Sequence, residues 1–199
     1  MIRLYYIISI LIAVGAMILV LARLDKRKTN VRRIVLISVM TALSIVSRFI
    51  FAAVPAFKPM AAIIILTGMY LGCEAGFMCG ALTAFLSNFY FGQGPWTPFQ
   101  MVAFGLVGVT AGLLASSLKK KRIVLVIYGI VAGIFYSFFM DIWTMLWAYS
   151  GLNLAGYIAA IATAVPYTVL YAASNVVFLL LLERPFGRRL GRIIHKYRI

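Results

Sequence analysis

Residues 123–148 read IVLVIYGIVAGIFYSFFMDIWTMLWA, an apolar run with a single charged residue, Asp141. About 20 consecutive apolar residues are enough for a helix to cross the hydrocarbon core of a bilayer. The core helices of soluble domains are shorter and alternate with polar segments. Residues 123–148 therefore predict a membrane-spanning helix, and the rest of the chain is interpreted outward from it.

The composition of the whole chain agrees with a lipid environment. Of the 199 residues, 64% are hydrophobic and 12% are charged, and the mean hydropathy is +1.04. The apolar runs lack the ten-residue alternation of a membrane β-barrel, so they predict helices and an all-α membrane protein. Residues 59–72 and 75–91 are short and predict a tight hairpin or tilted, partly broken helices. The six other apolar stretches are 4–22, 34–53, 59–72, 75–91, 98–117 and 156–182.

The cations indicate how the helices cross the membrane. Most of the 19 Lys and Arg residues lie in three clusters, within 23–33, 119–122 and 184–198. Cytoplasmic loops of membrane proteins carry an excess of Lys and Arg, and the number of predicted spans between the clusters is even. The sequence therefore predicts a multi-pass protein of the cell membrane, with the N-terminus outside and the C-terminus in the cytoplasm. Cations at chain turns also argue against a nucleic-acid-binding surface.

Three regions follow from this topology. Residues 1–33 are expected to form an N-terminal transmembrane helix and a basic cytoplasmic linker, because a signal peptide would show a small-residue cleavage site. Residues 34–183 are expected to form a six-helix substrate-binding domain. Residues 184–199 are expected to form a basic cytoplasmic tail.

The residue inventory argues against an enzyme. The only histidine, His195, lies in the basic tail, so no Ser-His dyad or HExxH zinc site can be built within the spans. No GxxxxGK[ST] phosphate loop is present, so the chain is not expected to hydrolyse ATP. Cys73 and Cys79 are predicted near the inner face and indicate neither a disulfide nor a metal site. We expect no catalytic residues, no metal and no covalently bound cofactor.

Small residues recur at intervals of four along the predicted hairpin, where they favour close packing of helices. Two further pairs, Gly108 with Gly112 and Gly129 with Gly133, have the same spacing. The hairpin series is Gly68, Gly72, Gly76, Gly80 and Ala84.

The predicted external loops are rich in aromatic residues, Gly and Pro and poor in charge, which favours a lid or cavity entrance for an organic ligand over a merely solvated surface. An interfacial aromatic belt remains the alternative for Trp96. A polar stripe at steps of four runs along the last predicted span: Thr163, Tyr167, Tyr171 and Asn175. It could line a ligand pocket or form hydrogen bonds between two helices. The candidate ligand-binding residues in or beside these loops are Lys58, Asn88, Gln93, Trp96, Gln100 and Asn153.

Two charges lie within predicted spans. Counted at 1.5 Å per residue, Arg48 and Asp141 lie about 7 Å and about 10 Å from the outer ends of their helices. An unpaired charge at that depth is costly, so the two residues are expected either to pair or to face a shared hydrated cavity. Both are therefore candidate substrate-binding residues.

Residues 34–182 resemble the substrate-specific S-components of energy-coupling factor transporters. The resemblance is strongest in four blocks, Ser47-Arg48-Phe49-Ile50-Phe51, Phe57-Lys58-Pro59, 68–77 and 87–101, of which the last is the most specific. Within that family the blocks are most similar to the cobalamin-type S-components. The chain departs from the six-helix pattern by its additional span at 4–22.

The resemblance implies a substrate-binding subunit that captures a vitamin, cobalamin in this subtype, from outside the cell. It also implies a transmembrane coupling subunit and two ATPase subunits as partners. The family's docking motif, small-xxx-small on the first family helix, is matched by Ser38 and Ala42. A stand-alone secondary transporter or a lipid-handling membrane protein is the alternative, and a structural membrane anchor is a third.

Overall fold

A computed structural model describes residues 31–148 and 152–197, together with single positions among the first 30 residues. The described residues form α-helices and no strands, which confirms the all-α class. The predicted span at 4–22 falls mainly outside the described residues. The helices are α2 (Val31–Ile50), α3 (Met60–Leu71), α4 (Cys73–Phe91), α5 (Thr97–Leu113), α6 (Ala115–Lys120), α7 (Arg122–Ala148) and α8 (Leu154–Tyr197).

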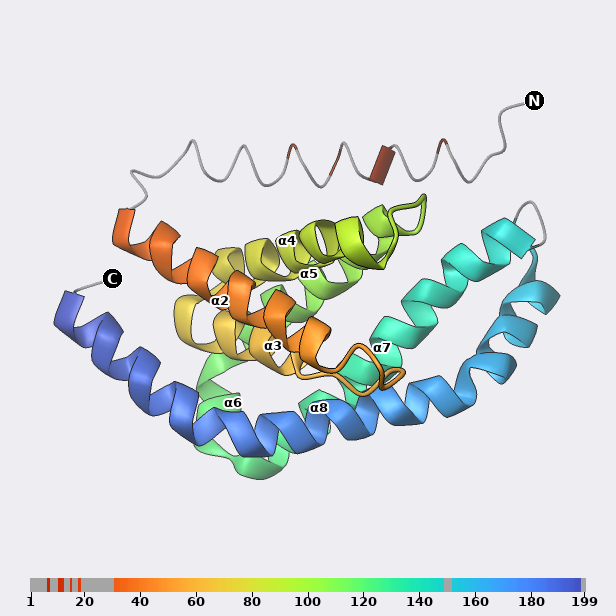
Figure 1. Ribbon diagram of the computed structural model, residues 1–199. Coiled ribbons are helices and arrows are strands. Elements are labelled where there is room, and N and C mark those ends of the chain that lie inside the picture. Colours follow the sequence, from red (N-terminus) through yellow and green to blue (C-terminus); the bar gives the residue numbers. More distant parts are fainter. Residues whose placement is uncertain are drawn as a thin grey trace.

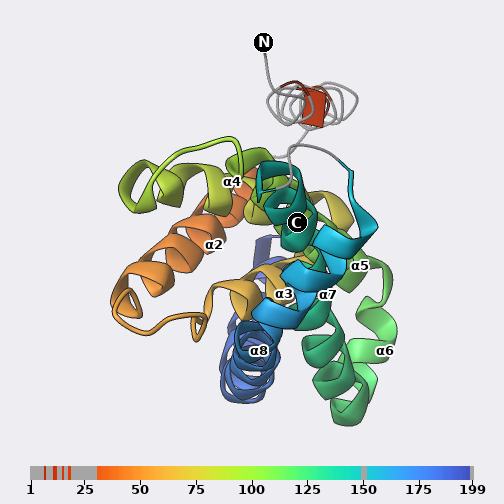
Figure 2. The ribbon, with the colours of Figure 1, turned by 90° about the vertical axis from the view of Figure 1, so that its right-hand side faces the viewer.

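Helices α2, α7 and α8 are long and apolar enough to cross a membrane, whereas α3 and α5 are shorter apolar helices. With 12 residues, α3 is about 18 Å long, less than the thickness of the hydrocarbon core. It does not need to meet lipid along its length, because ten of its residues are buried inside the protein. Figures 1 and 2 show it between α2 on one side and α7 and α8 on the other.

The break between α3 and α4 occurs at Gly72. Its φ of 91° is a backbone conformation that side chains with a Cβ rarely adopt. Helix α4 resumes at the next residue, Cys73, so the two predicted stretches form a tight hairpin as expected. The turn is held by Arg33, whose Nη2 donates to the carbonyl oxygen of Leu71 at 3.0 Å and lies 3.8 Å from a carboxylate oxygen of Glu74.

Glycines bring α3, α4 and α5 into backbone contact. A Cβ placed on Gly68 or Gly76 would collide with the backbone of Gly108, and one on Gly80 would collide with that of Phe104. A Cβ on Gly112 would lie 2.6 Å from the backbone nitrogen of Cys73. The predicted packing role is therefore confirmed for these glycines, whereas Gly72 of the same series ends α3 instead.

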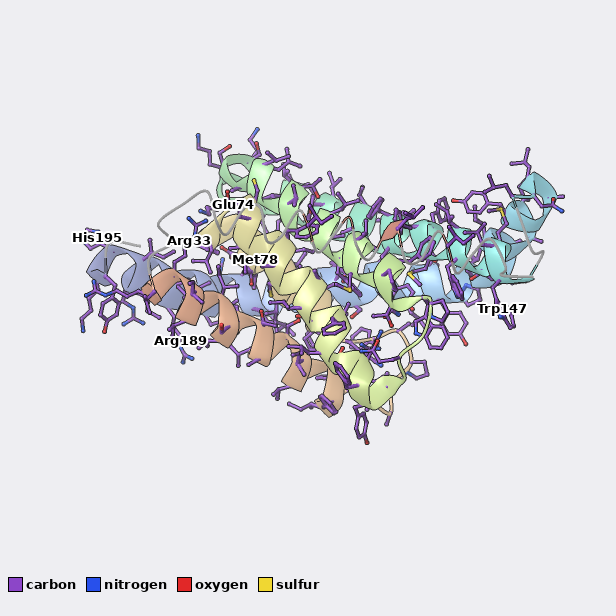
Figure 3. The ribbon with its side chains drawn as sticks, turned by 90° about the horizontal axis from the view of Figure 1, so that it is seen from above. Arg33, Glu74, Met78, Trp147, Arg189 and His195 are labelled. Atoms are coloured by element: carbon purple, nitrogen blue, oxygen red, sulfur yellow. The ribbon has the colours of Figure 1, made fainter. Side chains whose placement is uncertain are left out.

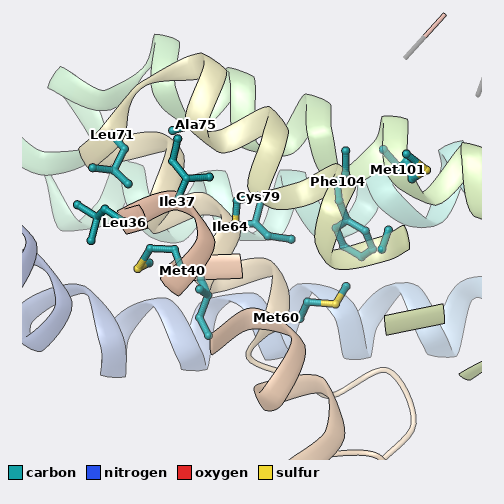
Figure 4. Packing of buried hydrophobic residues seen from close by; sticks show 14 of the residues in the cluster. Leu36, Ile37, Met40, Met60, Ile64, Leu71, Ala75, Cys79, Met101 and Phe104 are labelled. Atoms are coloured by element: carbon teal, nitrogen blue, oxygen red, sulfur yellow. The ribbon is translucent and has the colours of Figure 1, made fainter. Parts of the chain in front are cut away.

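One apolar core joins α2 to this hairpin. Figure 4 shows Leu36, Ile37 and Met40 of α2 facing Ile64 of α3 and Cys79 of α4. Each of these side chains is almost completely buried. The opposite face of α2 remains exposed in the protein, as expected for a helix that borders lipid or a partner.

Helix α8 extends farther than the sequence predicts. The apolar stretch ends near residue 182, but the helix continues through Pro185 to Tyr197. Its last turns are amphipathic: Leu190 is buried and Phe186, Ile193 and Ile194 pack on the core, which gives the basic segment a surface to fold against. The described part of the predicted tail is therefore helical rather than a separate extension.

The described residues of the three basic clusters gather at one end of the bundle, which agrees with an even number of spans between the clusters. Arg32 donates to the carbonyl oxygen of Tyr197, and Lys119 lies 4.6 Å from the ring centroid of Tyr70. Figure 3 shows Arg33, Arg189 and His195 at this end and Trp147 at the other. We call the end with Trp147 the outer end, following the predicted topology.

The glycine contacts generate a test of the fold. We expect Gly108→Ala to lower the free energy of unfolding by about 2 kcal/mol, because its methyl group must displace the backbone of α4. Gly191→Ala is the matched control, since a Cβ there meets nothing within 4 Å. Thermal unfolding in detergent measures both. Equal midpoints for the two variants would contradict the backbone contact.

Candidate ligand-binding cavity

A cavity of about 140 Å³ lies among α2, α3, α5, α7, α8 and the loop that follows α2. Met60, Ala61, Val107 and Ala132 form part of its apolar wall. The polar and titratable side chains that line it are Arg48, Lys58, Gln100, Tyr136, Tyr171 and Asn175. Three of the sequence candidates, Arg48, Lys58 and Gln100, are therefore brought together here.

Arg48 is held by neutral groups of α4. Its Nη1 donates to Ser87 Oγ and, at 2.8 Å, to Asn88 Oδ1. Its guanidinium also lies over the ring of Phe91, 4.4 Å from the centroid. Ser87 and Asn88 are consecutive, buried residues near the outer end of α4. Helix α4 therefore orients the Arg48 side chain toward the cavity.

A chain of hydrogen bonds leads from Arg48 across the cavity. Asn88 Nδ2 donates to Thr97 Oγ1 at 2.9 Å and to Gln100 Oε1 at 2.8 Å. Gln100 Nε2 then donates to the hydroxyl oxygen of Tyr136 at 3.4 Å. Asn88 thus acts behind the cavity wall: it links Arg48 to Gln100 rather than lining the cavity itself.

Aromatic rings form a wall next to these polar groups, which we call the aromatic shelf: Phe104, Tyr136 and Tyr171. The rings of Phe104 and Tyr136 are stacked with their centroids 4.3 Å apart. Tyr171 meets Tyr136 edge-on at 5.0 Å. A planar aromatic ligand would find both stacking and edge contacts here.

Lys58 reaches the cavity from the loop between α2 and α3. Its backbone is fixed by Ser174 of α8, whose hydroxyl accepts from the Lys58 amide at 2.9 Å and donates to the Lys58 carbonyl at 3.0 Å. The ammonium group lies 5.1 Å from the centroid of Phe91. Partial burial, and then the nearby charge of Arg48, lower the pKa of the Lys58 ammonium.

Besides Asn88 and Asp141, three further sequence candidates lie outside the cavity wall. Gln93 Nε2 donates to the carbonyl oxygen of Phe85 at 2.8 Å, and Asn153 Oδ1 accepts from the amide of Gly156 in the first turn of α8. Trp96 packs against Trp143, with ring centroids 6.3 Å apart. These side chains shape the loops at the outer end and do not line the cavity.

The expected proximity of Arg48 and Asp141 is not found. Among the described residues no ion pair joins them, and Asp141 is absent from the cavity wall. Asp141 is buried on α7, and its Oδ2 has no hydrogen-bond partner in the described part of the chain. Similar depth in the membrane did not bring the two together because depth leaves the direction of a side chain around its helix undetermined.

Sequence reasoning missed Tyr136 and Phe104 and only partly identified the stripe on α8. Tyr171 and Asn175 of that stripe line the cavity, whereas Thr163 bonds to backbone oxygens of its own helix and Tyr167 is exposed. Tyr136 follows Gly133 by three residues and so lies on the inward, small-residue face of α7. That spacing was an available signal for Tyr136.

These features define an all-α membrane protein with a polar and aromatic cavity between its helices. Residues 28–191 match the family model of the ECF-type riboflavin transporter S component, and the chain belongs to this family. It is therefore a substrate-binding subunit of an energy-coupling factor importer, a transporter component that works with an energy-coupling module. The resemblance to S-components is confirmed, whereas the cobalamin subtype is not. No curated protein and no solved structure matches the chain.

Separate surroundings for Arg48 and Asp141 predict additive effects. We expect the losses of stability in Arg48→Met and Asp141→Asn to sum in the double variant to within about 0.5 kcal/mol, because among the described residues they share no hydrogen-bond or ion-pair partner. Thermal unfolding of the four proteins in one detergent measures the cycle. A double variant clearly more stable than the sum predicts would indicate that the two charges interact.

Proposed function

We propose that the cavity captures a vitamin with a planar aromatic ring system, of the riboflavin class named in the family description. The observation that carries the proposal is the aromatic shelf beside a row of hydrogen-bonding groups, because flat heteroaromatic rings offer a face to stack and an edge to hydrogen-bond.

The size of the cavity bears on the choice between vitamins. A volume of about 140 Å³ is below the usual range for ligand pockets, so it suits a compact ring system better than a macrocycle. Cobalamin, implied by the sequence blocks, is the alternative ligand. Its corrin ring would require α2 and the loop after it to move away from α7 and α8.

Capture occurs from outside the cell in this proposal. The cavity-lining residues Arg48, Met60 and Gln100 lie in the last turn of α2 and the first turns of α3 and α5, away from the helix ends that carry the basic clusters. Positive clusters favour the cytoplasmic side. The loop around residues 51–59 closes over the ligand, with Arg48, Lys58 and Gln100 in contact with it. The loaded subunit then topples in the membrane to release the ligand into the cytoplasm.

Energy for this movement comes from a transmembrane coupling subunit with two ATPase subunits. The chain has no phosphate loop that could serve ATP hydrolysis. Ser38 and Ala42 lie one turn apart on the exposed side of α2, where small side chains let a partner helix approach closely. We assign this face to the coupling subunit.

Ligand identity is tested by binding of riboflavin to the purified protein, followed by quenching of flavin fluorescence. We expect Gln100→Leu to weaken binding about tenfold, equivalent to about 1.4 kcal/mol, because it removes an amide from the cavity wall. Gln93→Leu is the matched control and should stay within about twofold. Binding of cobalamin in place of riboflavin would contradict the proposed ligand class, and equal losses in both variants would contradict the proposed site.

The docking face is tested separately from ligand capture. We expect Ala42→Trp to leave riboflavin binding intact and to abolish uptake by proteoliposomes that contain the coupling subunit and the ATPases, because the bulky ring holds the partner helix away. Leu43→Trp is the control, since the next residue points about 100° away around the helix and is also exposed. Concentrative uptake by this chain alone would instead favour a secondary transporter.

A further inference from the structure

The cavity contains two cationic side chains and no acidic one. Arg48 and Lys58 line it, and no Asp or Glu does. The chain has four acidic residues, of which Asp25 lies outside the described part. Glu74 and Glu183 are at the basic end of the bundle, and Asp141 lies outside the cavity wall. Within the described residues, no carboxylate balances the two charges.

The guanidinium of Arg48 is only partly used by the protein. Both of its hydrogen bonds to Ser87 and Asn88 come from Nη1. The Nε and Nη2 groups have no hydrogen-bond acceptor among the described residues. These two groups form the edge of a guanidinium that binds a carboxylate or phosphate through two parallel hydrogen bonds.

The hydrogen-bond chain that starts at Arg48 has one direction. Arginine can only donate, so Asn88 must present its oxygen to Arg48 and its nitrogen to Gln100. Gln100 in turn presents its nitrogen to Tyr136, whose oxygen accepts. The hydroxyl hydrogen of Tyr136 is then left to donate. The chain thus supplies a further donor to the cavity wall.

Lys58 completes the donor-rich wall. Its ammonium group has no hydrogen-bond acceptor among the described residues and lies over the ring of Phe91, over which Arg48 also lies. Two cations near one ring repel each other in a partly buried site, and an anion between them would remove that cost.

We propose that the ligand carries an anionic group, a phosphate or a carboxylate, bound between the Nε–Nη2 edge of Arg48 and the ammonium group of Lys58. Its ring lies on the aromatic shelf, with acceptor atoms toward Tyr136. This inference rests on the proposed function. Among vitamins with a planar aromatic ring system, it selects those, or those derivatives, that carry a negative charge.

The test compares three flavins that share one ring system: neutral riboflavin, riboflavin 5′-phosphate and 10-carboxymethylflavin. We expect at least one of the anionic flavins to bind about tenfold more tightly than riboflavin at low salt, and this preference to shrink at high salt. Whichever anionic flavin binds more tightly identifies the group as phosphate or carboxylate. Riboflavin binding as tightly as both anions would overturn the inference and leave the proposed function intact.

Variants locate the anion. Lys58→Met should remove most of the preference for the anionic flavin, and Lys58→Arg should restore it. Lys119→Met is the matched control, because Lys119 also lies over an aromatic ring, at the opposite end of the bundle, and should leave the preference unchanged. A preference that survives Lys58→Met would overturn the placement.

If no flavin binds, the proposed ligand class fails, and mass spectrometry of the copurified ligand decides the inference: an acid supports it and a neutral molecule overturns it.

Discussion

Close approach of α3, α4 and α5 at their glycines is the constraint on which the rest of the structure depends. The backbone of Gly108 lies against Gly68 and Gly76, where no side chain could be inserted. This contact sets the positions of α4 and α5 relative to each other. Asn88 on α4 and Gln100 on α5 can then form a 2.8 Å hydrogen bond. The geometry of the cavity wall therefore depends on glycines that do not line the cavity.

The partly buried side chain of Arg48 fixes the direction of the hydrogen bonds in the cavity wall. Arg48 cannot accept a hydrogen bond, so each amide in the chain to Tyr136 has only one orientation that satisfies its neighbours. A network held in one direction is rigid, and its groups are already placed before a ligand arrives. This provides a physical reason for the use of two amides here, the buried Asn88 and the partly buried Gln100, in place of apolar residues.

The sequence identified some cavity-lining residues and included others that do not line the cavity, because it does not show in which direction a side chain points. Arg48, Lys58 and Gln100 were identified because a charge within a span and polar residues next to it are unusual in lipid. Gln93, Trp96 and Asn153 have the same sequence character, but their side chains contact Phe85, Trp143 and Gly156 instead. Loop composition indicates which end of the bundle is specialised and does not indicate which side chains turn inward.

By itself the sequence determined that the protein lies in lipid, that it is all-α, and that its basic clusters lie at the membrane surface. Long apolar runs can be satisfied only as helices in lipid, and cations are expelled from the membrane to its surfaces. Small residues at steps of four also determined where helices meet. Only the tertiary structure decided that Arg48 faces Asn88 and not Asp141, and that Tyr136 and Tyr171 share a wall. Those outcomes depend on how each helix is rotated about its axis, which is set by packing against neighbours from distant parts of the chain.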